Sequence, residues 1–260
     1  MRTLGLFLCL LLVEAGRAQS PYTNHPTNML ESNPLMIQED EACFSLAALR
    51  TTPKGAHISS YFQNPYYQKG HKQLNFALAY SFPKSQLKFG LQHMQYFQYR
   101  KQWMGVGLSK MLNENLSIGS QLFIGNEKFP EQFNLGVQSI QLALVKQHKQ
   151  NSLYAQFGFS RKQRLYSNMV FGCLRKWNNL LISDASIALD GYNSMTARFA
   201  LKLILNSSLS GMIFFNSHGT IGLQISLSAR EGRIIAQQFQ HANLGSSSAL
   251  GLSWKQDKAF

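Results

Sequence analysis

His57 and Ser59 are the residues whose types and spacing come nearest to a catalytic pair. They lie two positions apart, so on a strand both side chains point to the same face. A serine nucleophile with a histidine base also needs an acid or an amide that orients the imidazole ring. The residues on either side of the pair do not supply one. A lipid-active hydrolase is therefore the weaker reading, and we expect that the protein is not an enzyme.

The other side chains suited to catalysis or metal binding are scattered. The acids of the region after residue 100 are Glu114, Glu127, Glu131, Asp184, Asp190, Glu231 and Asp257. Most fall at predicted turns, and no two have the spacing of a general acid and its base. The sequence holds no His-Glu-x-x-His motif, no phosphate-binding Gly-rich loop and no Gly-x-Ser-x-Gly elbow. We expect no catalytic residue, no cofactor and no metal, and expect His93 and His148 to serve as hydrogen-bonding groups.

Long alternating segments dominate the rest of the chain. The clearest one places Leu74, Phe76, Leu78, Tyr80 and Phe82 on one face and Gln73, Asn75, Ala77, Ala79 and Ser81 on the other. Such alternation predicts a strand with one apolar face. Strands of soluble proteins usually have about five or six residues, whereas a tilted strand needs roughly 9–11 residues to cross a bilayer. The pattern therefore favours transmembrane strands, with a soluble β-sandwich as the alternative.

Similar segments follow one another from residue 42 onward. We place them near 42–51, 56–62, 72–82, 86–98, 102–112, 115–125, 132–146, 151–160, 166–175, 179–190, 194–206, 208–216, 219–229, 232–240 and 248–257. The first two are the least regular, and one of them is a rim segment if the strand number is even, as in bacterial single-chain barrels. The expected fold is an all-β, antiparallel, up-and-down transmembrane barrel of about 14 strands.

The two ends of the sequence predict separate parts. Residues 1–18 have the charged start, apolar centre and small-residue end of a secretory signal peptide. Residues 19–41 are rich in proline and acids, which argues against a central strand and predicts a leader or a plug of the barrel mouth. Residues 42–260 form the barrel. Cys43 and Cys173 remain in the mature chain, and the sequence leaves open whether they pair.

The formal charge is +13, which is typical of partners with phosphate groups. A signal peptide argues against nucleic acid, and the basic residues gather near strand ends rather than in one tract. Charge at the rims is typical of membrane barrels because charge at the bilayer midplane is costly. We assign most of these residues to solvated turns and treat Arg161, Lys162 and Arg164 as a candidate rim for lipopolysaccharide contact.

Breaks between the segments form two alternating sets, which in a barrel belong to opposite rims. The set with Pro83, Asn113, Lys149, Asn178 and Asn206 has tight-turn residues, and we assign it to the periplasmic side. The apolar phase slips by one position near Gln138 and Ser139, which predicts a bulge in the wall.

Aromatic residues near predicted strand ends are typical of interfacial belts. They are Tyr80, Phe82, Tyr96, Tyr99, Trp103, Trp177, Tyr192 and Trp254. We expect these side chains to lie at the level of the lipid headgroups.

Several motifs are similar to those of one family. Asn33-Pro34 resembles the Asn-Pro element before the first strand of Bacteroidota outer-membrane barrels of the PorV/PorQ type, which are related to the FadL fatty-acid transporters. The runs 89–96, 104–110 and 116–122 resemble that family's third to fifth strands, and 241–248 resembles its turn before the last strand. The long hatch of the fatty-acid transporters is missing, and Leu35 replaces the usual alanine.

The resemblance implies an outer-membrane barrel, and some members of the family serve type IX protein secretion. The first hypothesis is a non-enzymatic accessory component linked to that system, with outer-membrane lipids and either secretion components or exported cargo as partners. The second is a FadL-like transporter of small hydrophobic molecules. It predicts a lateral gap near Gln138, with an apolar pocket behind it.

Overall fold

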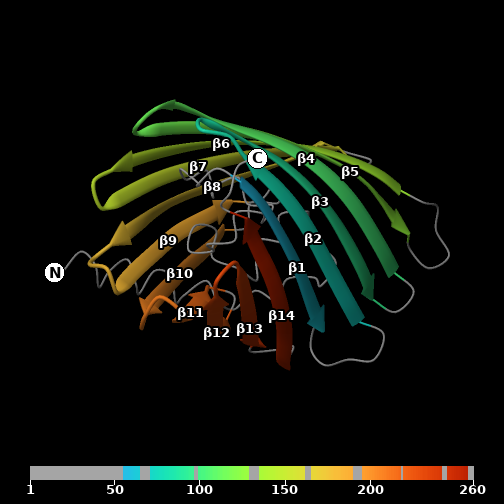
Figure 1. Ribbon diagram of the computed structural model, residues 1–260. Helices are drawn as coiled ribbons and strands as arrows, with labels where there is room; N and C mark the ends of the chain where they lie inside the picture. Colours follow the sequence, from blue (N-terminus) through green and yellow to red (C-terminus); the bar gives the residue numbers. More distant parts are fainter. Residues whose placement is uncertain are drawn as a thin grey trace.

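The described residues form a closed antiparallel barrel of fourteen strands (Figure 1). The computed structural model describes residues 55–64, 71–96, 99–128, 135–161, 165–189, 195–217, 219–241 and 245–256. The strands are β1 (Gly55–Asn64), β2 (His71–Ser81), β3 (Ser85–Tyr96), β4 (Tyr99–Asn113), β5 (Leu116–Lys128), β6 (Leu135–His148), β7 (Asn151–Arg161), β8 (Leu165–Lys176), β9 (Leu181–Leu189), β10 (Met195–Ile204), β11 (Leu209–Asn216), β12 (Thr220–Ala229), β13 (Gly232–His241) and β14 (Gly245–Gln256). Consecutive strands pair, and β1 pairs with β14 to close the wall. The predicted fold class is confirmed.

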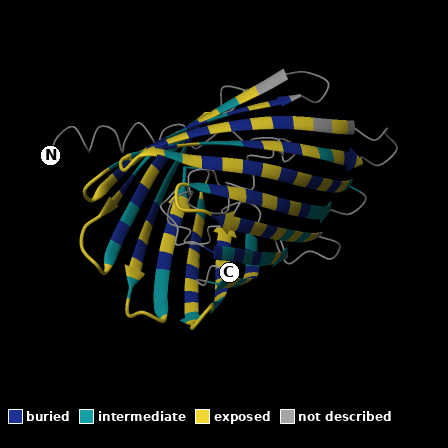
Figure 2. Ribbon diagram, turned by 45° about the horizontal axis from the view of Figure 1, so that its top comes forward, coloured by how far each residue is buried: buried dark blue, intermediate teal, exposed yellow. Residues whose placement is uncertain are grey.

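Alternation of side chains sets the two faces of the wall. Buried and exposed residues alternate along most strands, as the banding in Figure 2 shows. In β4, Met104, Val106 and Leu108 are exposed, and the residues between them are buried. Large apolar side chains thus cover the outside of the barrel. A soluble protein does not expose so continuous an apolar surface, whereas lipid accepts it.

Tight turns occupy one end of the barrel, which we call the tight-turn rim; it carries the connections after β2, β4, β6, β8, β10 and β12. The side-chain oxygens of Asn113, Asn178 and Asn206 each accept hydrogen bonds from backbone N–H groups two or three residues later. Lys149 and Arg230 adopt positive φ angles of 49° and 51° in the two-residue turns after β6 and β12. The predicted division of the turns between two rims is confirmed, and the periplasmic assignment of this rim stays a prediction.

Aromatic side chains at the tight-turn rim form part of the predicted belt. Tyr80, Phe82, Trp177 and Trp254 are all exposed, and the rings of Tyr80 and Phe82 pack edge to face with centroids 4.9 Å apart. Trp103 does not belong to the belt, because it is only 4 % exposed and lies on the interior face. Its position in β4 has the same parity as the interior glycines, so the belt prediction was wrong there.

Six glycines of the interior face lie beneath a large side chain from the directly opposite residue. The pairs are Gly107 with Gln121, Gly125 with Trp103, Gly158 with Asn168, Gly172 with Tyr154, Gly222 with Phe214 and Gly251 with Tyr61. A Cβ atom at any of these glycines would come within 3.0 Å of that side chain. The glycines therefore allow long side chains to lie flat against the neighbouring strand.

The wall around Gln138 and Ser139 is regular. Gln138 pairs with Ile124 of β5 and Arg161 of β7, and the register continues without a shift along β6. The bulge predicted there does not appear. Gln138 is exposed on the outer face in phase with Ile140 and Leu142, so the strand keeps its alternation and only the polarity of the outer face changes at Gln138. A register shift occurs instead between Met111 and Asn113, beside a tight turn.

Several other predictions lie outside the described residues. These are the signal peptide 1–18, the leader 19–41 with Asn33 and Pro34, the segment 42–51 and Cys43. The described wall begins at Gly55, and Cys173 on β8 is a free, half-buried thiol.

Candidate functional site

The His57–Ser59 pair points into the barrel, where both side chains are buried. The residues opposite His57 are Ala79 of β2 and Lys255 of β14, and those opposite Ser59 are Ala77 and Ser253. None of these four is an acid or an amide, so no orienting group of a triad stands directly opposite either residue. The arrangement gives no support to a hydrolase.

Metal binding and helical membrane spans find no support in the part of the chain that the structure describes. No group of three or more His, Cys, Asp or Glu side chains there has the arrangement of a metal site. No helix among those residues is long and apolar enough to cross a membrane. His93 lies near the opposite rim with its Nδ1 3.4 Å from the Gln102 amide nitrogen, and His148 is exposed beside a tight turn.

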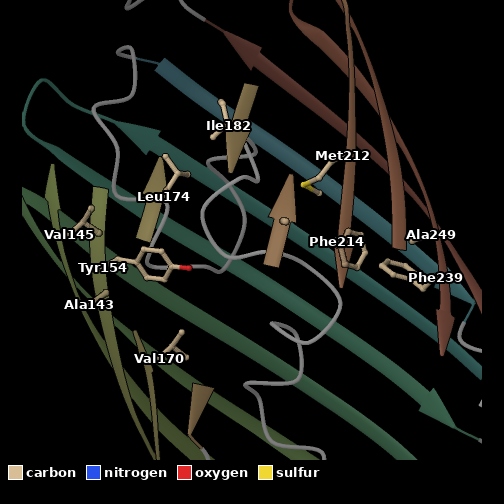
Figure 3. Close-up of a cluster of buried hydrophobic side chains, with 11 residues drawn as sticks. Ala143, Val145, Tyr154, Val170, Leu174, Ile182, Met212, Phe214, Phe239 and Ala249 are labelled. Atoms are coloured by element: carbon tan, nitrogen blue, oxygen red, sulfur yellow. The ribbon is translucent and has the colours of Figure 1, made fainter. Parts of the chain in front are cut away.

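The largest cluster of buried apolar side chains in the described part of the chain lies on the inner wall. Its buried members are Ala143, Val145, Tyr154, Val170, Leu174, Ile182, Ala200, Met212, Phe214, Phe239 and Ala249. They come from β6 to β11, β13 and β14, and Figure 3 shows them projecting from the strands into the barrel. The rings of Phe214 and Phe239 meet edge to face with centroids 5.3 Å apart. This part of the inner wall is thus apolar, although polar residues are buried elsewhere on the inner face.

One buried polar contact crosses three strands at the edge of this cluster. The hydroxyl of Tyr154 on β7 donates a 2.9 Å hydrogen bond to Oδ1 of Asp184 on β9. Its ring reaches β9 by lying over Gly172 of β8, where a Cβ atom would be 2.2 Å from Tyr154 Cζ. Both residues are nearly inaccessible to solvent. The contact therefore places one carboxylate at a defined position in the interior.

Amides and hydroxyls form short ladders elsewhere on the inner face. The Gln156 amide donates to Gln141 Oε1 over 3.1 Å, and the Ser160 hydroxyl donates to Ser139 Oγ over 2.9 Å. On the other side of the barrel, the Gln237 amide donates to Gln224. These bonds join neighbouring strands and so stabilise the wall. The amides and hydroxyls that form them also line the interior.

A second group of aromatic residues lies on the inner face of β4 and β5. The rings of Trp103 and Phe123 pack edge to face with centroids 6.4 Å apart, and both side chains are 4 % exposed. Lys101 Nζ lies 4.9 Å from the centroid of the Trp103 ring and 3.9 Å from Glu127 Oε1. The cation thus contacts both an aromatic face and a carboxylate.

The polar face of the segment 72–82 holds only amides, alanines and a serine, but the interior of the barrel also contains charges and aromatic rings. Buried charges are Lys88, Lys101, Glu127, Asp184 and Lys202, and the buried aromatics are Trp103, Phe123, Tyr154, Phe214 and Phe239. Parity is the signal that identifies most of them, since each except Lys202 falls in phase with glycine, serine or glutamine on its strand, whereas Lys202 is in phase with Thr196 and Ala200. The rim cluster predicted for lipopolysaccharide is described only at Arg161, the last residue of β7, while Lys162 and Arg164 lie outside the described residues.

Comparison with known proteins shows the fold. No family model and no curated protein sequence matches the chain. Among solved structures, the CymD monoaromatic hydrocarbon channel is similar with a TM-score of 0.62 and 8 % identity over 86 % of this chain and 94 % of that one. The Pseudomonas putida toluene transporter TodX matches with a TM-score of 0.60 and 9 % identity over 94 % and 96 % of the two chains.

A Pseudomonas aeruginosa FadL homologue matches with a TM-score of 0.56 and 10 % identity over 87 % of this chain and 96 % of that one. The identities are too low to carry function across. The PorV/PorQ resemblance and a Bacteroidota source stay predictions. The comparisons and the topology agree that the chain has the fourteen-strand barrel fold of the FadL-type outer-membrane channels.

Proposed function

We propose that this chain is a non-enzymatic outer-membrane channel for small hydrophobic molecules. The observation that carries the proposal is the apolar cluster on the inner wall of a closed barrel with the FadL-type fold. With fourteen strands the interior exceeds what side chains fill in an eight-stranded barrel. Apolar residues facing such an interior favour apolar solutes, because burial of apolar surface is favourable by roughly 25 cal/mol per Å².

The interior rather than the wall is the proposed route. A lateral gap was expected near Gln138, but Gln138 itself pairs with Ile124 of β5 and with Arg161 of β7, and all fourteen described strands pair with both of their neighbours. The apolar surface expected behind the gap is present on the inner wall instead. Solutes would therefore pass along the residues of the apolar cluster.

The secretion-linked accessory role remains a prediction from the family resemblance. The channel fold supports transport directly and gives secretion no comparable support. Secretion components, exported cargo and outer-membrane lipids remain predicted partners. Affinity purification of the full chain from its own host separates the two readings, because an accessory component would co-purify with secretion proteins.

Uptake by intact cells tests the transport proposal. A Gram-negative host without its own hydrophobic-solute channel is needed, because neutral hydrocarbons cross a plain phospholipid bilayer unaided. Expression of the full chain should increase the initial rate of labelled toluene uptake several-fold. Phe214→Gln combined with Phe239→Gln should remove most of the increase, whereas Phe214→Leu should keep it. An uptake rate that does not change on expression of a folded barrel would overturn the proposal.

A further inference from the structure

Three buried side chains on the inner face of β3, β4 and β5 carry polar atoms without a hydrogen-bond partner. They are Oε1 of Gln92, Nε1 of Trp103 and both amide atoms of Gln121. The three side chains are 6 %, 4 % and 1 % exposed, respectively. A buried polar atom without a partner costs about 1–3 kcal/mol, and folded proteins seldom retain several together. The group therefore requires a physical explanation.

The three side chains lie around Gly90 of β3 and Gly105 of β4, two glycines that directly oppose each other and are both buried. Trp103 directly opposes Gln92 of β3, and Gln121 directly opposes Gly107 of β4. Between these rows, Gly105 opposes Gly90 on one side and Phe123 on the other. We call Gln92, Trp103, Gln121 and Phe123 the amide–indole patch. The two glycines add no side chain of their own, so the patch consists of two aromatic rings and two amides.

The unpartnered atoms define what would complete the patch. The indole N–H and the Gln121 amide nitrogen donate, whereas the amide oxygens of Gln92 and Gln121 accept. A group that both donates and accepts, such as a hydroxyl, can satisfy members of both sets. A hydrocarbon satisfies neither, and a carboxylate brings negative charge to the two amide oxygens. The nearby charges of Lys101 and Glu127 lie 3.9 Å apart and offset each other.

We propose that the amide–indole patch binds small hydroxylated aromatic molecules of the phenol class. The aromatic body packs against Trp103 and Phe123, and the hydroxyl bonds with the indole and amide groups. The inference rests on the proposed channel function and narrows its substrate class. It also departs from the hydrocarbon named for the similar channels, since these polar atoms discriminate against a plain hydrocarbon.

Tryptophan fluorescence tests the site directly. The chain has three tryptophans, so Trp177→Phe with Trp254→Phe leaves Trp103 as the single reporter in the full chain. The probes are p-cresol and p-xylene, which differ by a hydroxyl in place of a methyl group, together with p-toluate as the anion. Free concentrations are set by equilibrium dialysis, and excitation at the red edge of the indole band avoids absorption by the cresol.

We expect p-cresol to bind about tenfold more tightly than p-xylene, as one satisfied buried group predicts. Gln121→Leu should abolish this preference, and the same substitution at Gln237, on the distant strand β13, should preserve it. Heat-modifiable gel mobility confirms that each variant is folded, and Gln92→Leu replaces Gln121→Leu if the latter does not fold.

Equal binding of p-cresol and p-xylene would overturn the inference, as would tighter binding of p-toluate. A cresol preference that survives Gln121→Leu would also overturn it and would indicate that water alone satisfies the amides. Toluene uptake by cells distinguishes failure of the phenol site from failure of the proposed channel function. If uptake occurs while p-cresol shows no preference, the channel function stands and the phenol site fails. If expression leaves uptake unchanged, the channel function itself fails.

Discussion

The Tyr154 ring lies across Gly172 so that its hydroxyl reaches Asp184 two strands away, over a hydrogen bond of 2.9 Å. A side chain at position 172 would occupy the space of the ring. The contact joins β7 to β9 in addition to the backbone ladders of β8. It therefore couples three strands of the wall through one pair of side chains.

Substitution of the covered glycine should weaken the barrel. In Gly172→Ala the new Cβ would lie 2.2 Å from Tyr154 Cζ, and the ring cannot move without loss of its bond to Asp184. We expect a loss of about 1–3 kcal/mol in unfolding free energy, measured by urea titration of the protein in lipid vesicles. Gly211→Ala is the control, since its Cβ would have no atom nearer than 3.9 Å. Equal effects of the two substitutions would contradict the packing argument.

Removal of the tyrosine hydroxyl alone tests the hydrogen bond. Tyr154→Phe should lower the unfolding free energy by about 1.5–3 kcal/mol, the usual contribution of a hydrogen bond to a charged group. Combination with Asp184→Asn in a double-mutant cycle should show coupling between the two positions. Tyr80→Phe, on the exposed belt, should change the same quantity little. Additive effects of the two interior substitutions would argue against a direct bond.

The energetic cost of a charged substitution on the lipid-facing surface should depend on its depth in the bilayer. Leu142 is an exposed residue in the middle of β6, and Leu153 is exposed two residues from a tight turn. Arginine at position 142 should cost about 2–4 kcal/mol, and arginine at position 153 about 0–1 kcal/mol. Unfolding in lipid vesicles measures both values. If both substitutions are equally tolerated, the apolar band does not lie in the bilayer.

Asparagine side chains should stabilise the tight-turn rim. Oδ1 of Asn178 accepts hydrogen bonds from the backbone N–H groups of Leu180 and Leu181 at 2.9 and 2.7 Å. Asn178→Ala should lower the unfolding free energy by about 1 kcal/mol, because those donors lose their partner. The neighbouring Asn179→Ala should have a smaller effect. A larger loss at Asn179 would show that this turn is held in another way.

Period-two alternation was sufficient to predict the architecture, but it did not predict the chemistry of the interior. Met104, Val106 and Leu108 define the outer face of β4, and that phase already places Trp103 inside. The belt prediction relied on proximity to the strand end and so put Trp103 on the wrong face. In β11, residues 212–215 are apolar on both faces, so the pattern there carries no polarity signal.

The amide–indole patch could not be predicted from the sequence, for a different reason. Gln92, Trp103 and Gln121 belong to three strands, and only the register of those strands brings them together. Alternation within one strand predicts which face of the sheet each side chain occupies, but it does not predict the register of that strand against the next one. The candidate site thus depends on pairing that no single segment encodes.

The pairing of β1 with β14 has a consequence for how the molecule assembles. All the remaining strand pairs join strands that are consecutive in the sequence, and most of these strands are connected by short turns. Such local contacts form quickly, whereas contacts between distant parts of a chain form slowly because loop closure is entropically costly. The seam, where Tyr61 covers Gly251, unites the first and last described strands. The kinetic barrier to completing the barrel is therefore concentrated in this single strand pair.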